Sequence, residues 1–174
     1  TWVTREEDVM ERLVVSGVTY NLDEAKIRLI GVRDQPGIAG QVFTPLSEAG
    51  IVVDVIIQNL SSDGSTDLTF TVPRADYARA LEITRQTGER VGCGGVEGDE
   101  EIGKVSIVGL GMRDHAGVAT KMFNVLAHEG INIQLINTSE IKISVVVEEK
   151  YVELAVRALH AAFVDDGATE PKEE

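Results

Sequence analysis

The chain has 174 residues, 43% of them hydrophobic and 26% charged, a composition typical of globular proteins. Its net charge of −13 argues against nucleic acid or an anionic membrane as a partner and favours a small molecule or another protein. The single cysteine, Cys93, excludes an internal disulfide and suggests a reducing, cytoplasmic location. No apolar run reaches the roughly 18 residues that a membrane-spanning helix requires.

An internal repeat is the most informative feature of the sequence. Arg33–Phe43 is RDQPGIAGQVF, and Arg113–Phe123 is RDHAGVATKMF. When Arg33–Asn59 is aligned with Arg113–Ser139, nine of the 27 positions are identical. In the first copy these are Arg33, Asp34, Gly37, Ala39, Phe43, Leu46, Gly50, Ile51 and Ile56. The repeat predicts two copies of one structural unit.

The first unit is predicted to alternate strands and helices. In chain order we expect a strand at Lys26–Val32, a helix from Pro36 to Gly50, strands at Ile51–Asn59 and Asp67–Val72, a helix at Arg74–Gln86 and a short strand around Arg90–Val96. Proline suits a first helical position, and glycine suits the left-handed residue after a helix. Pro45 lies inside the first helix, where it predicts a local bend.

Apolar spacing predicts which side chains of the first unit are buried. Leu68, Phe70 and Val72 alternate as one face of a strand does. For the second helix, Ala75, Ala78 and Leu81 mark the expected apolar side. The resulting order, βαββαβ, is the ferredoxin-like split β-α-β arrangement.

The second unit lacks its last strand. We expect a strand at Lys104–Gly111, a helix at Gly117–Glu129, strands at Ile131–Ser139 and Ile141–Glu148, and a helix at Tyr151–Phe163 that buries Val152, Ala155, Leu159 and Phe163. The β-prone segment Arg12–Leu22 is predicted to cross over and complete the second sheet. The fold class is therefore α+β: two antiparallel sheets with helices on one face, the first unit inserted in the second.

This topology predicts the domain boundaries. The first domain is expected at residues 24–98, and the second is expected to combine residues 12–22 with residues 99–164. Residues 165–174 form an acidic tail that is poor in apolar side chains and is expected to be disordered.

Signatures of common enzyme chemistry are absent from the sequence. It has no phosphate-binding loop, no dinucleotide fingerprint and no paired nucleophile and base. His115, His128 and His160 lack metal-ligand spacing, so we expect neither a metal nor a cofactor. The GCGG cluster around Cys93 is interpreted as a turn or an edge strand, and we expect the chain to be non-catalytic by itself.

The two repeated turns have the chemistry to bind a free amino acid. The N–H groups at a helix N-terminus attract a carboxylate, and Gly37, Ile38 and Ala39 are the candidate donors, with Gly117, Val118 and Ala119 in the second copy. Asp34 and Asp114 lie beside these donors, where an ammonium group would be accepted. The alternative is that both aspartates only cap their helices.

The pattern of a strand, Asp-x-Pro-Gly, an amphipathic helix and a β-rich hairpin resembles the ACT domain, a small amino-acid-sensing module usually used in pairs. The strings INTSEIKIS (Ile136–Ser144), VIIQN (Val55–Asn59) and STDLTF (Ser65–Phe70) are similar to the regulatory region of bacterial aspartokinases. The resemblance covers Leu13 to Phe163, nearly the whole chain.

The resemblance implies the regulatory β subunit of an ATP-dependent aspartate kinase, whose product leads to lysine, threonine and methionine. Such a subunit binds threonine, lysine or both for feedback inhibition, forms a homodimer and joins a kinase-bearing α subunit as α2β2. It implies an effector site between the first ACT domain of one chain and the second of its partner chain. The residues carried over are Asp34, Ala39, Val52, Val53, Asp54, Gln58, Val118, Ala119, Asn132, Ile133, Ser139 and Glu140.

The two turns differ in sequence, and two alternative functions stay open. The second turn has His115 and Ala116 where the first has Gln35 and Pro36, so the two turns need not bind the same effector. An ACT-type small subunit of another biosynthetic enzyme, such as a valine-sensing subunit of acetolactate synthase, is the first alternative. A free-standing catalytic ferredoxin-like domain is the second.

Overall fold

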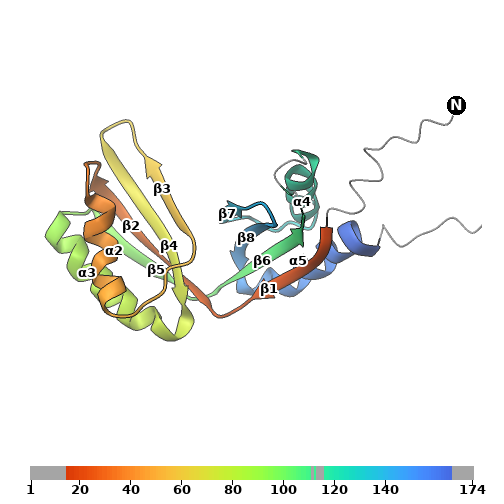
Figure 1. The fold of residues 1–174 in the computed structure, drawn as a ribbon, viewed down its shortest axis with the longest axis horizontal. Helices are drawn as coiled ribbons and strands as arrows, with labels where there is room; N and C mark the ends of the chain where they lie inside the picture. Colours follow the sequence, from red (N-terminus) through yellow and green to blue (C-terminus); the bar gives the residue numbers. More distant parts are fainter. Residues whose placement is uncertain (1–14, 111, 113–115, 166–174) are drawn as a thin grey trace, which may run out of the picture. The chain divides into compact units, whose positions relative to one another are not determined.

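The computed structural model describes residues 15–110, 112 and 116–165. The chain divides into two compact units. We call residues 23–102 the inserted unit, and residues 15–22 together with the described part of 103–165 the split unit. Each unit is a four-stranded antiparallel sheet with its helices on one face (Figure 1). The predicted disordered tail, apart from Asp165, lies outside the described residues.

The inserted unit has the predicted βαββαβ order. Its elements are β2 (Glu24–Arg33), α2 (Ile38–Glu48), β3 (Ile56–Leu60), β4 (Ser65–Pro73), a 3-10 turn (Arg74–Asp76), α3 (Tyr77–Val91) and β5 (Gly95–Asp99). The strands are ordered β3-β4-β2-β5 in the sheet, so β3 and β5 are its edges.

The split unit is completed by a strand from the other end of the sequence. It contains β1 (Val15–Asn21), β6 (Ile102–Gly109), α4 (Ala116–His128), β7 (Leu135–Thr138), β8 (Lys142–Glu148), a 3-10 turn (Glu149–Tyr151), α5 (Val152–His160) and a π-helical turn (Ala161–Asp165). The sheet order is β1-β6-β8-β7, with β1 antiparallel to β6. The insertion of one unit within the other is thereby confirmed, whereas the predicted residue boundaries of the two domains stay a prediction.

The buried side chains follow the predicted pattern on the strands. Leu68, Phe70 and Val72 are each at most 1% exposed, and Phe43 of α2 packs edge-on against Phe70 with ring centroids 5.2 Å apart. In the split unit, α5 buries Val152, Ala155 and Leu159 as expected, with Phe163 packed at the edge of that core. Burial of these apolar faces holds each helix layer on its sheet.

The prediction for α3 was wrong in its end and in most of its face, since Leu81 packs against the core as predicted but the two predicted alanines do not. The helix continues to Val91, past the predicted strand start at Arg90, and ends at Gly92, whose φ is +71°. Its buried side is formed by Ala80, Thr84, Thr87 and Gly88, while Ala75 and Ala78 are exposed. Small side chains let this helix approach the sheet, and the hydroxyl of Thr84 is satisfied by the carbonyl oxygen of Ala80 at 2.7 Å.

Three predicted strands begin several residues later than expected, and one of them, β5, starts at Gly95 and not around Arg90. β3 starts at Ile56 and not at Ile51, and β7 starts at Leu135 and not at Ile131. Ile51 and Ile131 each follow a left-handed glycine and bury their side chains in the core. The chain therefore crosses from the helix layer to the sheet before regular pairing begins.

Candidate functional site

The turn from β2 into α2 forms an open helix N-terminus. The N-cap of α2 is Gly37, with a φ of +89°, and no described side chain caps it. The N–H of Ile38 donates to the carbonyl oxygen of Gln35 at 3.2 Å, which tightens the turn. Asp34 therefore does not cap this helix, which was the structural alternative for its role. The positive end of the helix dipole is left without a side-chain acceptor, as an anion site requires.

Asp34 is held by its backbone, and its carboxylate is exposed. Its N–H donates to the carbonyl oxygen of Gly64, at the tip of the β3–β4 hairpin, at 3.0 Å. Gly37 and Ala39 are exposed as well, whereas the side chain of Ile38 lies in the core. Of the four candidates at this turn, Asp34, Gly37 and Ala39 are exposed to solvent, and the buried side chain of Ile38 leaves only its backbone as a candidate group.

The candidates at Val52, Val53 and Asp54 lie at the other end of α2. The helix has 11 residues, so its two ends are about 16 Å apart. Val52 is 68% exposed, Val53 packs against the core, and Asp54 is exposed. Gln58 lies on the edge strand β3 opposite Leu68, with its side chain exposed. The inserted unit by itself therefore does not bring Val52, Val53 and Asp54 to the turn at Asp34.

In the split unit the candidates divide between surface and core. Val118 is buried, and Ala119 and Ile133 pack against the same core, so their side chains are structural. Asn132 is exposed in the segment that precedes β7. Asp114 and His115 lie outside the described residues, so the second turn itself is not described.

Ser139 and Glu140 belong to the β7–β8 hairpin. The Ser139 hydroxyl donates to the carbonyl oxygen of Lys142 at 3.3 Å and accepts the Lys142 N–H at 3.2 Å, which closes the turn. The side chain of Glu140 is exposed, while its carbonyl oxygen accepts the N–H of Met112 at 2.9 Å. Glu140 is therefore available to a ligand, and Ser139 is used within the turn.

The sequence patterns did not single out three residues of the inserted unit, Gly31, Asp67 and Thr71. Thr71 holds the segment 51–55 through hydrogen bonds to Val55, and Asp67 accepts the N–H of Gly31 at 2.8 Å. Glycine within a strand pattern signals a bulge, and an acid is disfavoured in a strand. The strings RLIGVR and STDLTF contained these two signals.

Two aspartates of the β3–β4 hairpin, Asp67 and Asp63, have their negative charge stabilised by hydrogen bonds. The N–H of Gly31 and the guanidinium of Arg28 hold the pKa of Asp67 below its ordinary value. At the hairpin tip, the hydroxyl and N–H of Ser65 lower the pKa of Asp63. Both aspartates are therefore anions that fix the β3–β4 hairpin, whose tip contacts Asp34.

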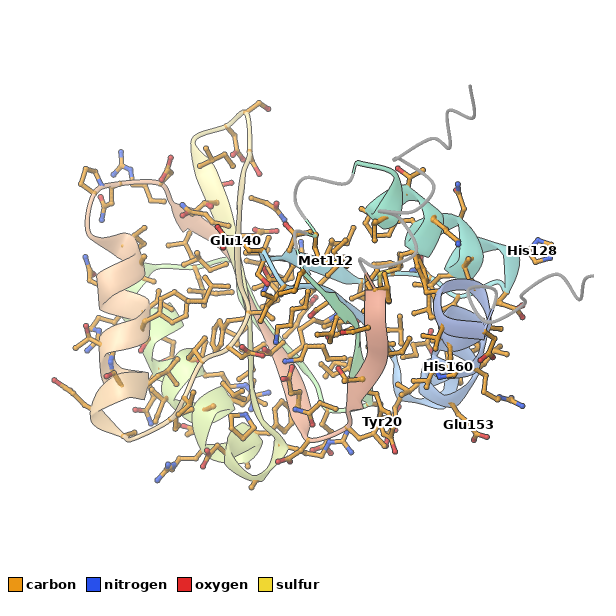
Figure 2. The ribbon with its side chains drawn as sticks, turned by 45° about the vertical axis from the view of Figure 1, so that its right-hand side comes forward. Tyr20, Met112, His128, Glu140, Glu153 and His160 are labelled. Atoms are coloured by element: carbon orange, nitrogen blue, oxygen red, sulfur yellow. The ribbon has the colours of Figure 1, made fainter. Side chains whose placement is uncertain are left out.

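Other side-chain clusters give no enzyme-like site. No group of three or more metal-ligating residues occurs among the described residues, and His128 and His160 lie exposed on α4 and α5 (Figure 2). Open hollows lie along α4 and α5, between Tyr20 and Glu153, and along α2 beside Gly37. Among the described residues, no hydrogen bond joins a hydroxyl to a histidine or a carboxylate within any of these three hollows.

None of the helices in the described part of the chain combines the length and apolar character needed to cross a membrane.

Comparison with known proteins places this architecture in a family. The family model described as ACT domain matches residues 27–87 and 105–163. An aspartokinase of Pseudomonas aeruginosa is 58% identical over 158 residues, which are 91% of this chain and 38% of that protein. The chain thus spans well under half of this curated relative.

Two solved structures match this chain over nearly the whole of their own length. One, described as aspartokinase alpha and beta subunits, has 52% identity and a TM-score of 0.81, covering 86% of this chain and 98% of the other. The second, the ligand-free regulatory subunit of aspartate kinase from Thermus thermophilus, has 43% identity and a TM-score of 0.82, covering 86% and 99%. By these matches and its paired sheets, the chain belongs to the ACT-domain family and to the regulatory part of the aspartokinases.

Proposed function

We propose that the chain senses a free amino acid, L-threonine with or without L-lysine, and passes feedback inhibition to a kinase-bearing subunit. The observation that carries this proposal is the uncapped N-terminus of α2 at Gly37, with the exposed carboxylate of Asp34 three residues before it. An acceptor for an ammonium group therefore lies beside donors for a carboxylate, which is the pair of charges of a free α-amino acid.

The chemistry of each proposed contact is simple. Backbone N–H groups at the start of α2 bind the effector carboxylate, and Gly37 has no Cβ to block its approach. Asp34 accepts the ammonium group by a charge-assisted hydrogen bond. Gln58 would hydrogen-bond the hydroxyl of threonine, and Glu140 would pair with the side-chain ammonium of lysine. No cofactor enters this scheme.

Two chains would be needed to complete the site. The start of α2 and the segment 51–55 lie at opposite ends of one helix, so one inserted unit cannot bring both sets of candidate residues to the same ligand. Antiparallel docking of the first ACT domain of one chain with the second of its partner would bring Asp34 beside Asn132 and Ile133. The exposed apolar side chains of the edge strands β3 and β7 support such docking, because unpaired edges readily pair with another strand.

Inhibition would then arise by population shift. An effector that bridges two chains stabilises the assembled regulatory dimer, and it acts on the kinase only through its differential affinity for two arrangements. The kinase-bearing partner is supported by the solved relative that contains alpha and beta subunits. For the regulatory chain alone, the measurable consequence is tighter dimerisation in the presence of effector.

Calorimetric titration of the 174-residue chain with L-threonine, L-lysine and L-valine tests the proposal, followed by sedimentation with each ligand. We expect threonine to bind and to shift the sedimentation toward dimer. The methyl ester of L-threonine and N-acetyl-L-threonine are matched controls, because each removes one of the two charges, and both should bind more weakly. Binding of valine alone, or of none of the three, would contradict the proposed function.

A further inference from the structure

Strand β2 carries one extra residue opposite Asp67. Leu29 pairs with Leu68 of β4, whereas Val32 pairs with Thr66, so Ile30 and Gly31 together face a single residue. Gly31 has a φ of +64°, which glycine adopts without steric cost. Two residues opposite one, with a left-handed glycine, make a β-bulge.

The bulge decides which face of the sheet the following residues occupy. Ile27 and Leu29 point into the core, and Val32 is also fully buried. Without the extra residue, Val32 would point to the opposite face, because side chains alternate along a strand. The shifted register continues beyond β2, since the N–H of Asp34 bonds to the carbonyl oxygen of Gly64. The bulge therefore sets the direction in which the chain enters the turn at Asp34.

Asp67 is the side chain that holds this bulge. Its Oδ1 accepts the N–H of Gly31 at 2.8 Å, and its Oδ2 accepts a hydrogen bond from the guanidinium of Arg28, which lies on β2 with Gly31. From the other side, the carbonyl oxygen of Ile30 accepts the N–H of Gly94 at 2.7 Å. The side chain of Asp67 is 18% exposed, so its bond to Gly31 is partly shielded from water. No other side-chain bond to the bulge is found among the described residues.

We propose that Asp67 is a positioning residue for amino-acid binding, acting through the bulge at Gly31 on the turn at Asp34. This inference rests on the proposed function, because it assumes that the turn binds an effector. It assigns to the acid of the STDLTF string a role in effector affinity without any contact to the effector. Asp67 lies on β4, three residues from Gly64, so the strand and the hairpin tip that contact the turn are parts of one hairpin.

The test compares three variants of the 174-residue chain by titration with L-threonine and L-lysine. Asp67→Val is the disrupting variant, since valine suits a strand and has no acceptor. Asp67→Asn keeps an oxygen for the Gly31 N–H but loses the charge. Glu97→Gln is the matched control, because Glu97 also faces Arg28, at 3.9 Å, and makes no bond to the bulge. Asp67→Ala replaces the valine variant if that protein does not fold.

We expect Asp67→Val to weaken effector binding about tenfold, because the Gly31 N–H loses its acceptor, and Asp67→Asn to restore most of the affinity. Amide hydrogen exchange measured by NMR should quicken at Gly31 and Asp34 in Asp67→Val and stay slow in Glu97→Gln. Wild-type affinity in Asp67→Val would overturn the positioning role and leave the proposed function intact. Failure of the wild-type chain to bind any amino acid would overturn both the proposed function and the positioning role. Unchanged exchange at Gly31 in Asp67→Val would overturn the positioning role, whether threonine or lysine is the effector.

Discussion

Thr71 and Val55 are joined by two hydrogen bonds. The N–H of Val55 donates to the hydroxyl oxygen of Thr71, and the N–H of Thr71 donates to the carbonyl oxygen of Val55, both at 3.1 Å. The side chain of Thr71 is fully buried. This pair anchors the segment 51–55, which carries three candidate effector residues, to the central strand β4.

Replacing Thr71 by valine should therefore destabilise the protein. The buried N–H of Val55 would lose its acceptor, and an unsatisfied buried donor costs about 1–3 kcal/mol. Urea unfolding followed by circular dichroism measures the loss. Thr71→Ser keeps the hydroxyl and should lose less, so equal stability of the valine and wild-type proteins would show that the side-chain bond is dispensable.

Alanine at Gly37 and at Gly40 should change stability in opposite directions. Gly37 has a φ of +89°, where alanine is strained by roughly 1–2 kcal/mol. Gly40 lies within α2 and a Cβ there meets no atom within 4 Å, so alanine should stabilise the helix by up to about 1 kcal/mol. Thermal unfolding of both variants checks the difference. A destabilised Gly40→Ala protein would argue against the described start of α2.

Asp34→Ala should lose effector affinity and keep its stability. The structural bond of Asp34 is made by its backbone, and no described side-chain cap depends on its carboxylate. Removing a charged hydrogen-bond partner of the effector should weaken binding about ten- to a hundredfold, while the free energy of unfolding changes by less than about 0.5 kcal/mol. Unchanged affinity by calorimetry would remove Asp34 from the site.

A charge on the edge strand β3 should weaken self-association. Ile56 and Leu60 are 52% and 70% exposed, and a lysine at an edge opposes pairing with another chain. We expect Ile56→Lys to sediment as monomer at concentrations where the wild type is dimeric. Gln86→Lys, on the exposed side of α3, makes the same change of charge and should leave the association unaltered.

The contribution of Asp67 to stability should depend on pH. Because its pKa in the folded state lies below its ordinary value of 3.8, folding favours the charged form. The stabilisation is fully present above the unfolded-state pKa and is lost as the pH falls through the folded-state pKa. Asp67→Asn should therefore be less stable than wild type at pH 7, and the two should converge well below pH 3.8. A gap that persists in acid would assign the effect to packing.

The repeat made most of the fold predictable. The glycine at Gly50 and the alternation of Leu68, Phe70 and Val72 are local signals, because backbone sterics and side-chain direction act within a few residues. The cross-over of the strand ending at Asn21 was predictable by counting, since one unit had a spare strand and the other lacked one. The buried face of α3 was not predictable, because Thr84 and Gly88 carry no hydrophobic signal.

The sequence by itself determined the two ACT units, their insertion and the position of the single Asp-x-Pro-Gly turn before α2, because the units follow from an internal repeat and the insertion follows from a spare strand in one place and a missing strand in the other. Only the tertiary structure decided that Gly37 and not Asp34 occupies the N-cap, that Val118 and Ile133 belong to the core, and that Asp67 reaches the bulge at Gly31. These contacts join residues far apart in the sequence, and their partners are fixed by strand register and helix packing, which local patterns do not encode.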